Sequence, residues 1–404
     1  MISSFAWRNL WRNKLRSLII IAAMTLGIFA GIFLTAFTNG MINARIQSII
    51  STEMSHIQIH KPGFLDNDQF SLLIENADSS INLVRETPDV VAASKRIIIN
   101  SMVASAEIGT GVKIIGIDPA NESKVTNMSS KIITGKYLDS TDRNPVVISE
   151  ILSQKLKVGL KNKIIITVQD VNKNITGGAF HVVGIYRTDN MMFDEANIFM
   201  NGTDLSRLTG LSGKEAHEIA VLLDKNETSE AVKALSEKLP GLEVSAWQQL
   251  SPEAGYLVSA MNQYMFIFII VILIALCFGI INTMLMVIME RIHELGMLMA
   301  IGMNKMRVFN MIMLETVFLS LTGGIAGLII GYIAISYFAK AGINLFFWKE
   351  AFAELGYSSL VYPVIDSKTM VLTAIMVTFA GLISALYPAY KALKLNPSEA
   401  IRTQ

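Results

Sequence analysis

A short charged run interrupts the apolar second half of the chain and is the first place to look for chemistry. It reads Glu290-Arg-Ile-His-Glu-Leu-Gly-Met-Leu-Met-Ala-Ile-Gly302. Because residues three or four apart share a helix face, one predicted face is apolar and another is charged. The apolar face holds Ile292, Leu295, Met299 and Gly302, and the charged face holds Glu290, His293 and Glu294. Gly302 is placed to end this helix and Asn304 to begin the next. The run therefore predicts a short amphipathic helix that lies on a surface.

The chain lacks the patterns that would make it an enzyme by itself. It contains no GxxxxGK[ST] phosphate loop, so it cannot bind a nucleotide by that mechanism. His56 and His60 show no metal-ligand spacing with a third residue, and we expect them on a solvated strand face. The one cysteine, Cys277, lies in an apolar stretch, which leaves no Cys/His or Ser/His/Asp set. We therefore predict no catalytic, cofactor-binding or metal-binding residue.

Four stretches without Asp, Glu, Lys or Arg organise the chain. They cover residues 17–44, 254–289, 316–339 and 369–390. Each is at least the roughly 20 residues that a helix needs to cross a bilayer. The composition agrees, because 52% of the residues are hydrophobic and only 17% are charged. A net charge of +1 argues against nucleic acid as a partner. We predict an integral membrane protein with one transmembrane helix, a large water-exposed domain and three further transmembrane helices.

The orientation of these helices follows from charge and parity. Arg8, Arg12, Lys14 and Arg16 precede the first stretch and place the N-terminus in the cytoplasm. A cleaved signal peptide is the alternative, but the apolar run is too long for one. Four spans return the C-terminus to the cytoplasm, so the middle block faces outward. The predicted parts are an amphipathic helix (1–16), the first span and stalk (17–44), the outer domain (45–253), a stalk and the second span (254–289), a cytoplasmic loop (290–303), the third span (304–339), an outer loop (340–368), the fourth span (369–390) and a cytoplasmic tail (391–404).

The second apolar stretch is longer than a bilayer requires. Its 36 residues would form a helix of about 54 Å, against roughly 30 Å of hydrocarbon. We predict that its first part, with residues 39–51, forms a helical stalk that carries the outer domain. That domain is predicted to be α/β from its alternating and helical patterns. The expected strands are 56–60, 112–117, 146–149, 163–168, 181–186 and 218–223, and the expected helices are 79–86, 150–156 and 229–239.

The predicted spans contain few polar groups. Glu315 is costly if it faces lipid, so we expect it to pair with Asn282 or the 290–294 cluster, or to lie at the headgroup boundary. A proton relay is the alternative reading. Gly323, Gly327 and Gly331 have the spacing of a close helix contact, and a bent helix is the alternative.

Three motifs resemble the FtsX-type permease domain of ABC transporters. The first is Glu290-Arg291 with Glu294-x-Gly296, Ala300-x-Gly302 and Glu315. The second runs from Tyr387-Pro388-Ala389 to Ala400-Ile401-Arg402, and the third is Trp7-Arg8-Asn9-Leu10-x-Arg12-Asn13-Lys14 at the other end. This family includes the macrolide exporter MacB and the lipoprotein-releasing permeases LolC and LolE, and the layout is most similar to the last two. The resemblance implies a MacB-like periplasmic core domain at 45–253 and an FtsX-like permease domain at 254–404.

The resemblance also implies a mechanism and partners. Two permease subunits, identical or homologous, would assemble on a dimer of a separate cytoplasmic ABC ATPase, which binds ATP and Mg²⁺. The loop helix would dock on that ATPase through Glu290, Arg291, Glu294, Gly296, Ala300 and Gly302. ATP hydrolysis would then move the outer domain of a protein in the cell inner membrane.

Three functions remain open at this point. Release of lipoproteins to a periplasmic carrier is the first reading. Export of small molecules or peptides with a periplasmic adaptor is the second. A regulator that, like FtsX, relays ATPase motion to a cell-wall hydrolase is the third.

Overall fold

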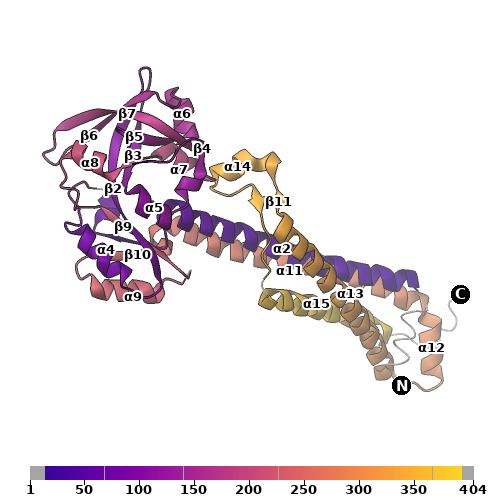
Figure 1. The fold of residues 1–404 in the computed structure, drawn as a ribbon. Coiled ribbons are helices and arrows are strands. Elements are labelled where there is room, and N and C mark those ends of the chain that lie inside the picture. The colour runs from indigo at the N-terminus through magenta and orange to yellow at the C-terminus, as the bar shows by residue number, and fades with distance from the viewer. Residues whose placement is uncertain (1–13, 68, 140, 226, 366, 394–404) are drawn as a thin grey trace. The chain divides into compact units, whose positions relative to one another are not determined.

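The computed structural model describes residues 14–393 except positions 68, 140, 226 and 366 (Figure 1). The predicted helix over residues 1–16 and the C-terminal motif beyond Leu393 therefore lie largely outside the described residues. The chain divides into two compact units. The helical unit comprises Met1–Ile42, Val258–Asn344 and Leu360–Gln404, and the sheet unit comprises Asn43–Leu257 and Leu345–Ser359.

Among the described residues, four long helices and one short helix make up the helical unit, and the ends of α2 and α11 extend beyond it. They are α2 (Lys14–Ser48), α11 (Pro252–Glu290), α12 (Ile292–Ala300), α13 (Lys305–Ala341) and α15 (Ser367–Leu393). All but α12 contain a segment long and apolar enough to cross a membrane. Their buried core includes Met24, Ile28, Met284 and Leu319. A two-stranded ribbon of β11 (Ile343–Asn344) and β12 (Leu360–Val361) also belongs to this unit.

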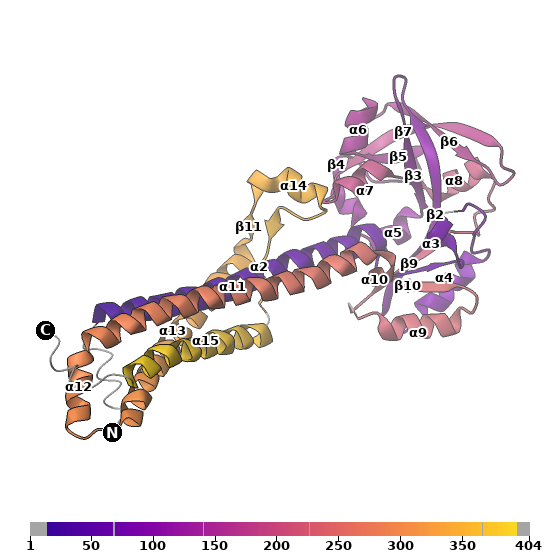
Figure 2. The same cartoon turned by 180° about the vertical axis from the view of Figure 1, so that it is seen from behind.

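One half of the sheet unit is an open sheet covered by helices. Its strands are β1 (Ile57–His60), β2 (Val90–Ala104), β9 (Glu218–Leu223) and β10 (Glu243–Ala246), in the order β10-β1-β9-β2. Helices α4 (Ala77–Arg85) and α9 (Ser229–Lys238) lie beside this sheet (Figure 2). Their side chains Ile81, Val84 and Leu235 are buried in its core. On other parts of it lie η1 (Ile49–Met54), α5 (Pro119–Val125) and α10 (Trp247–Leu250). Helix α3 (Phe64–Asn67) follows β1.

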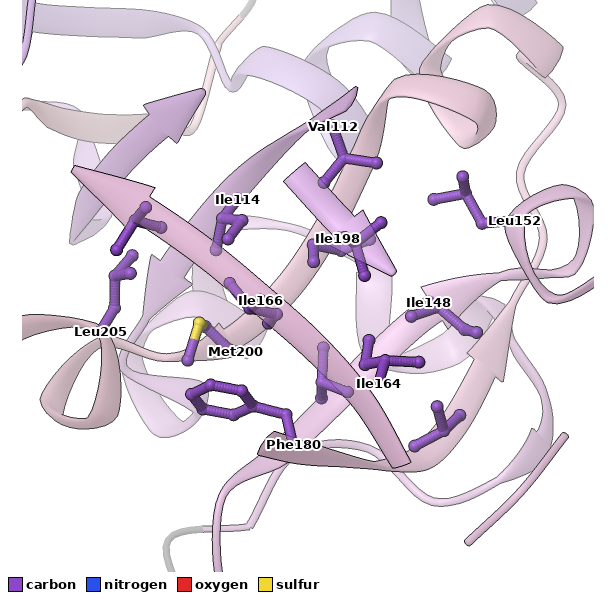
Figure 3. Packing of buried hydrophobic residues seen from close by; sticks show 14 of the residues in the cluster. Val112, Ile114, Ile148, Leu152, Ile164, Ile166, Phe180, Ile198, Met200 and Leu205 are labelled. Carbon is purple, nitrogen blue, oxygen red and sulfur yellow. The ribbon is translucent and has the colours of Figure 1, made fainter. Parts of the chain in front are cut away.

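The other half of the sheet unit is a small closed barrel. Six strands pair in a ring, β2-β3-β8-β5-β7-β6 and back to β2. Besides β2, they are β3 (Gly109–Ile117), β5 (Pro145–Ser149), β6 (Lys163–Gln169), β7 (Ile175–Tyr186) and β8 (Asn197–Asn201). Alternate side chains fill the interior, as Ile164 and Ile166 of β6 illustrate in Figure 3. Each such buried isoleucine stabilises the barrel by about 1.5–3 kcal/mol.

Short elements close the barrel and connect its strands. They are η2 (Met128–Lys131), β4 (Ile132–Gly135), α6 (Glu150–Leu156), α7 (Met191–Ala196) and α8 (Gly202–Thr209). The segment Leu345–Ser359 adds η3 (Phe346–Trp348) and α14 (Lys349–Glu354) to the sheet unit.

All six expected strands and all three expected helices of the sheet unit are present. The sequence analysis missed β2, the longest described strand, because polar residues such as Lys95 and Arg96 interrupt its apolar runs. Arg96 is also buried, so polarity does not alternate with burial along the strand. The expectation of solvated histidines was wrong, since His56 and His60 are 5% and 0% exposed. Strand β1 lies between β9 and β10 and is covered on both faces, which the short motif could not reveal.

Candidate functional site

Helix α12 is held by well-formed turns at its C-terminal end. Gly302 has a φ of +100°, and its N–H donates to Met299 O while the N–H of Met303 donates to Leu298 O. These two bonds form a Schellman turn, which glycine favours because it lacks a Cβ. The side chain of Asn304 then accepts from the N–H of Met306 and caps α13. Both predicted caps are confirmed, so α12 has a defined direction between α11 and α13.

Arg291 connects the start of α12 to α13 through ion pairs. Its Nη1 lies 3.2 Å from both carboxylate oxygens of Glu315, and its Nε lies 3.2 Å from Oε2 of Glu294. The Arg291 and Glu315 side chains are 13% and 8% exposed, whereas Glu294 is 38% exposed. Arg291 and Glu315 are mostly enclosed by the helical unit, so removing either partner would destabilise the bundle. Glu315 is therefore paired within the bundle with the 290–294 cluster, and Asn282 is exposed on α11.

The two faces of α12 differ in exposure. Leu295 and Gly296 are buried against the helical unit, and Leu295 belongs to its core. Met297 is 54% exposed, and Ile301 just beyond the helix is 85% exposed. His293, Ala300 and Gly302 are also exposed, and Glu290 ends α11 on the exposed side. The outward surface of α12 thus combines charged groups with two large apolar side chains.

The glycines of α13 lie at its contact with α2. A Cβ at Gly323 would lie 2.7 Å from Met24 Cβ, and one at Gly327 would lie 2.9 Å from Ile28 Cβ. The Thr25 hydroxyl donates to Gly323 O at 3.1 Å. Gly331 is looser, because a Cβ there would lie 3.9 Å from Ile32. The two helix backbones therefore approach most closely at Gly323 and Gly327.

A buried ionic network in the sheet unit was not anticipated from the sequence. Arg96 on β2 contacts Glu122 at 2.6 Å and Glu218 at 2.7 Å, and Glu218 also meets His60 Nε2 at 3.3 Å. Burial by itself lowers the pKa of Arg96, but the charges of Glu122 and Glu218 outweigh burial and raise the pKa. His60 and Glu218 lie directly opposite each other in the β1–β9 register. Only that register could have identified the pair.

A second polar cluster lies within the sheet unit, which includes the last residues of α2 from Asn43 onward. The Nη1 of Arg45 lies 2.6 Å from Oε1 of Glu53, which also accepts from Asn190 Nδ2 at 3.1 Å. Asn190 caps α7 through the N–H groups of Met192 and Phe193. The first charged residue after the apolar part of α2 is thereby connected to α7.

A pocket of about 340 Å³ lies beside α7, bounded by α6 and α14. Its lining includes Glu150, Arg187, Asp194, Lys349 and Glu350. Burial raises the pKa of Asp194 to about 6, although both hydrogen bonds from Thr188 oppose the shift. The pocket is mixed in charge, and Arg187 pairs with Glu150 at 3.0 Å.

Comparisons with known proteins place the chain in a family. Residues 17–239 match the MacB-like periplasmic core domain, and residues 265–397 match the FtsX-like permease C-terminal domain. The first match alone covers more than half of the chain. The chain thus belongs to the MacB-like, FtsX-like family of ABC transporter permeases, which are membrane proteins that normally work with a cytoplasmic ABC ATPase.

Several relatives show the range of this family. An ABC transporter permease of Methanocaldococcus jannaschii is 28% identical over 281 residues, which are 66% of this chain and 64% of that protein. The match therefore spans just under two thirds of that relative. LolC of Neisseria meningitidis, a lipoprotein-releasing system protein, is 23% identical over 81% of this chain and 83% of its own. The macrolide export protein MacB of Sodalis glossinidius is 29% identical over 31% of this chain and 17% of its own.

A solved structure of the periplasmic region of MacB from Actinobacillus actinomycetemcomitans is also similar. It is 14% identical, covers 52% of this chain and 96% of its own, and has a TM-score of 0.38.

Proposed function

We propose that this chain is the permease subunit of a MacB/Lol-type ABC system that releases lipoproteins from the inner membrane. Two such subunits, identical or homologous, would assemble on a dimer of a cytoplasmic ABC ATPase that binds ATP and Mg²⁺. The N- and C-termini would lie in the cytoplasm, and the sheet unit would face the periplasm and its lipoprotein carrier. The similarity to LolC over most of both chains supports this choice of substrate.

The Arg291 cluster is the observation that carries the mechanism. If an ATPase docks on α12, its motion can reach the membrane-spanning helices only through a rigid connection between α12 and those helices. Arg291 directly precedes α12 and pairs with Glu315, which lies ten residues after the start of α13. We infer that Met297 and Ile301 contact the ATPase while Arg291 passes its displacement to α13.

Helices α2 and α11 would carry this displacement from the membrane toward the sheet unit. Helix α11 contains 39 residues and would be about 58 Å long, well beyond the hydrocarbon thickness. We propose that the parts of α2 and α11 outside the bilayer form a stalk that moves the sheet unit. Arg45 and Glu53 would connect this stalk to α7.

Export of a small amphiphilic molecule through a periplasmic adaptor is the second candidate. The similarity to MacB favours it, although that match covers only 31% of this chain. A regulator of a cell-wall hydrolase is the third. A neighbouring gene for an adaptor or for an outer-membrane channel would favour export, and one for a lipoprotein carrier would favour release.

The test is charge reversal on the exposed side of the loop. The E290K/E294K variant and the wild type are purified with the cognate ATPase, and both assembly and ATP turnover are measured. We expect weakened assembly or turnover, because the reversed charges face the docking partner and disturb Arg291.

The matched control is E237K, which reverses an exposed charge on α9 in the sheet unit. It should leave both quantities unchanged. Wild-type assembly and turnover in E290K/E294K would exclude α12 as the docking element.

A further inference from the structure

Three consecutive aromatic residues of the segment after α13 are exposed. Phe346, Phe347 and Trp348 form η3 and are 70%, 100% and 64% exposed. Large apolar side chains are normally buried, and a contiguous exposed group indicates a surface that meets another phase or molecule. We call these three residues the aromatic triad.

The covalent connections keep the triad near the end of a membrane helix. Helix α13 ends at Ala341, and β11 follows at Ile343–Asn344. Phe346 comes two residues after β11, so it lies within about 7 Å of that strand's last residue by chain length. The ribbon of β11 and β12 belongs to the same unit as the four apolar helices.

The composition of this region is that of a membrane interface. Tryptophan and other aromatic residues concentrate where hydrocarbon meets headgroups, and lysines extend their charge toward water there. Lys340 ends the third charge-free stretch of the chain, and its side chain is exposed. Tyr337, one turn earlier on α13, is 67% exposed and continues the aromatic character on that helix.

The charged residues of the same segment line a pocket of the sheet unit. Lys349, Glu350 and Glu354 of α14 line the pocket beside α7. Those groups therefore meet the polar surface of the sheet unit, while the aromatic triad is left without protein cover in the described chain.

We propose that the aromatic triad is an interfacial anchor that inserts into the lipid headgroup region at the end of the third span. The segment Leu345–Ser359 then gives the chain a membrane contact separate from α2 and α11. This inference needs only that α13 spans a membrane, and it is independent of the substrate and of the ATPase.

Trp348 provides a direct readout. A variant with W7F, W11F and W247F keeps Trp348 as its one tryptophan. It is reconstituted in nanodiscs of phosphatidylethanolamine and phosphatidylglycerol, with and without lipids brominated near the headgroup end of the acyl chain. We expect blue-shifted emission that falls several-fold with the brominated lipid.

The matched control keeps only Trp247, through W7F, W11F and W348F. Trp247 is 7% exposed in the sheet unit, so brominated lipid should not quench it. Red-shifted, unquenched emission from Trp348 would show that the triad is in water. Blue-shifted but unquenched emission would show that protein, such as a second copy, covers it, and either result overturns the proposal.

A second measurement does not depend on W247F folding. A spin label is attached at F347C in a C277S background, with all tryptophans retained. Accessibility to oxygen should exceed accessibility to a water-soluble nickel complex. A label at I175C, which replaces a side chain that is 82% exposed on β7, should show the reverse. Equal behaviour at the two positions would also overturn the proposal.

Discussion

Replacing Gly327 by alanine tests how closely α13 approaches α2. A Cβ at this position would lie 2.9 Å from Ile28 Cβ and 2.9 Å from Thr25 O. Carbon atoms pack best at about 3.5–4.0 Å, so the added methyl forces the helices apart. The Thr25 oxygen belongs to the backbone and cannot move without its helix. Overpacking of this kind costs about 1–3 kcal/mol.

The helix propensity of alanine opposes this cost. Alanine is better than glycine in a helix interior by about 1 kcal/mol. The net effect of G327A is therefore between neutral and a loss of about 2 kcal/mol. A control that gains the same propensity without the clash is needed to isolate the steric cost.

Gly331 supplies that control, because it lies one turn further along the same helix. A Cβ there would lie 3.9 Å and 4.0 Å from atoms of Ile32, which is ordinary contact. G331A should therefore gain about 1 kcal/mol, and G327A should be less stable than G331A by about 1–3 kcal/mol.

The assay compares unfolding of the full chain in mild detergent for the wild type and both variants. Since propensity cancels between G327A and G331A, their difference reports the helix contact alone. If G327A is as stable as G331A, α13 and α2 are not in close backbone contact and the reasoning fails. G323A should behave like G327A, because its Cβ would lie 2.7 Å from Met24 Cβ.

Three further predictions concern other parts of the molecule. Asp194 has a pKa of about 6 in the folded protein, against an ordinary 3.8. The protonated side chain therefore contributes to the free energy of unfolding at low pH, and this contribution is lost as the pH rises through 6. The stability of the wild type should therefore fall relative to that of D194N between about pH 4 and 6, by at most about 3 kcal/mol. Parallel plots of stability against pH for the two proteins would contradict this prediction. Two glycines inserted after Met261 should loosen α11 and abolish substrate release while ATP hydrolysis persists, and survival of both activities would exclude mechanical transmission there. Residues 45–253 expressed alone should melt cooperatively, and an aggregated product would contradict an autonomous domain.

The local structure of this chain is largely encoded in local sequence. Helices 150–156 and 229–239 were predicted from their helical periodicity, and the structure has them at Glu150–Leu156 and Ser229–Lys238. The caps at Gly302 and Asn304 were predictable for the same reason, since each depends on a few neighbouring residues. Long charge-free stretches likewise predicted four apolar helices, because crossing a membrane demands length and lack of charge within one segment.

Pairing between distant segments was decided only by the tertiary structure. Whether Glu315 meets Arg291 or Asn282 depends on how α12 and α13 cross, which no local pattern records. Closure of the barrel depends on β6 pairing with both β2 and β7, and strand partners far apart in sequence leave no local signal. The same holds for His60, whose motif looked like a solvated strand until β9 and β10 covered it. The sequence alone indicated the apolar helices, the caps at Gly302 and Asn304 and most of the short elements, because these depend on neighbouring residues. Register, burial and ion pairing depend on residues brought together by folding, and only the tertiary structure decided them.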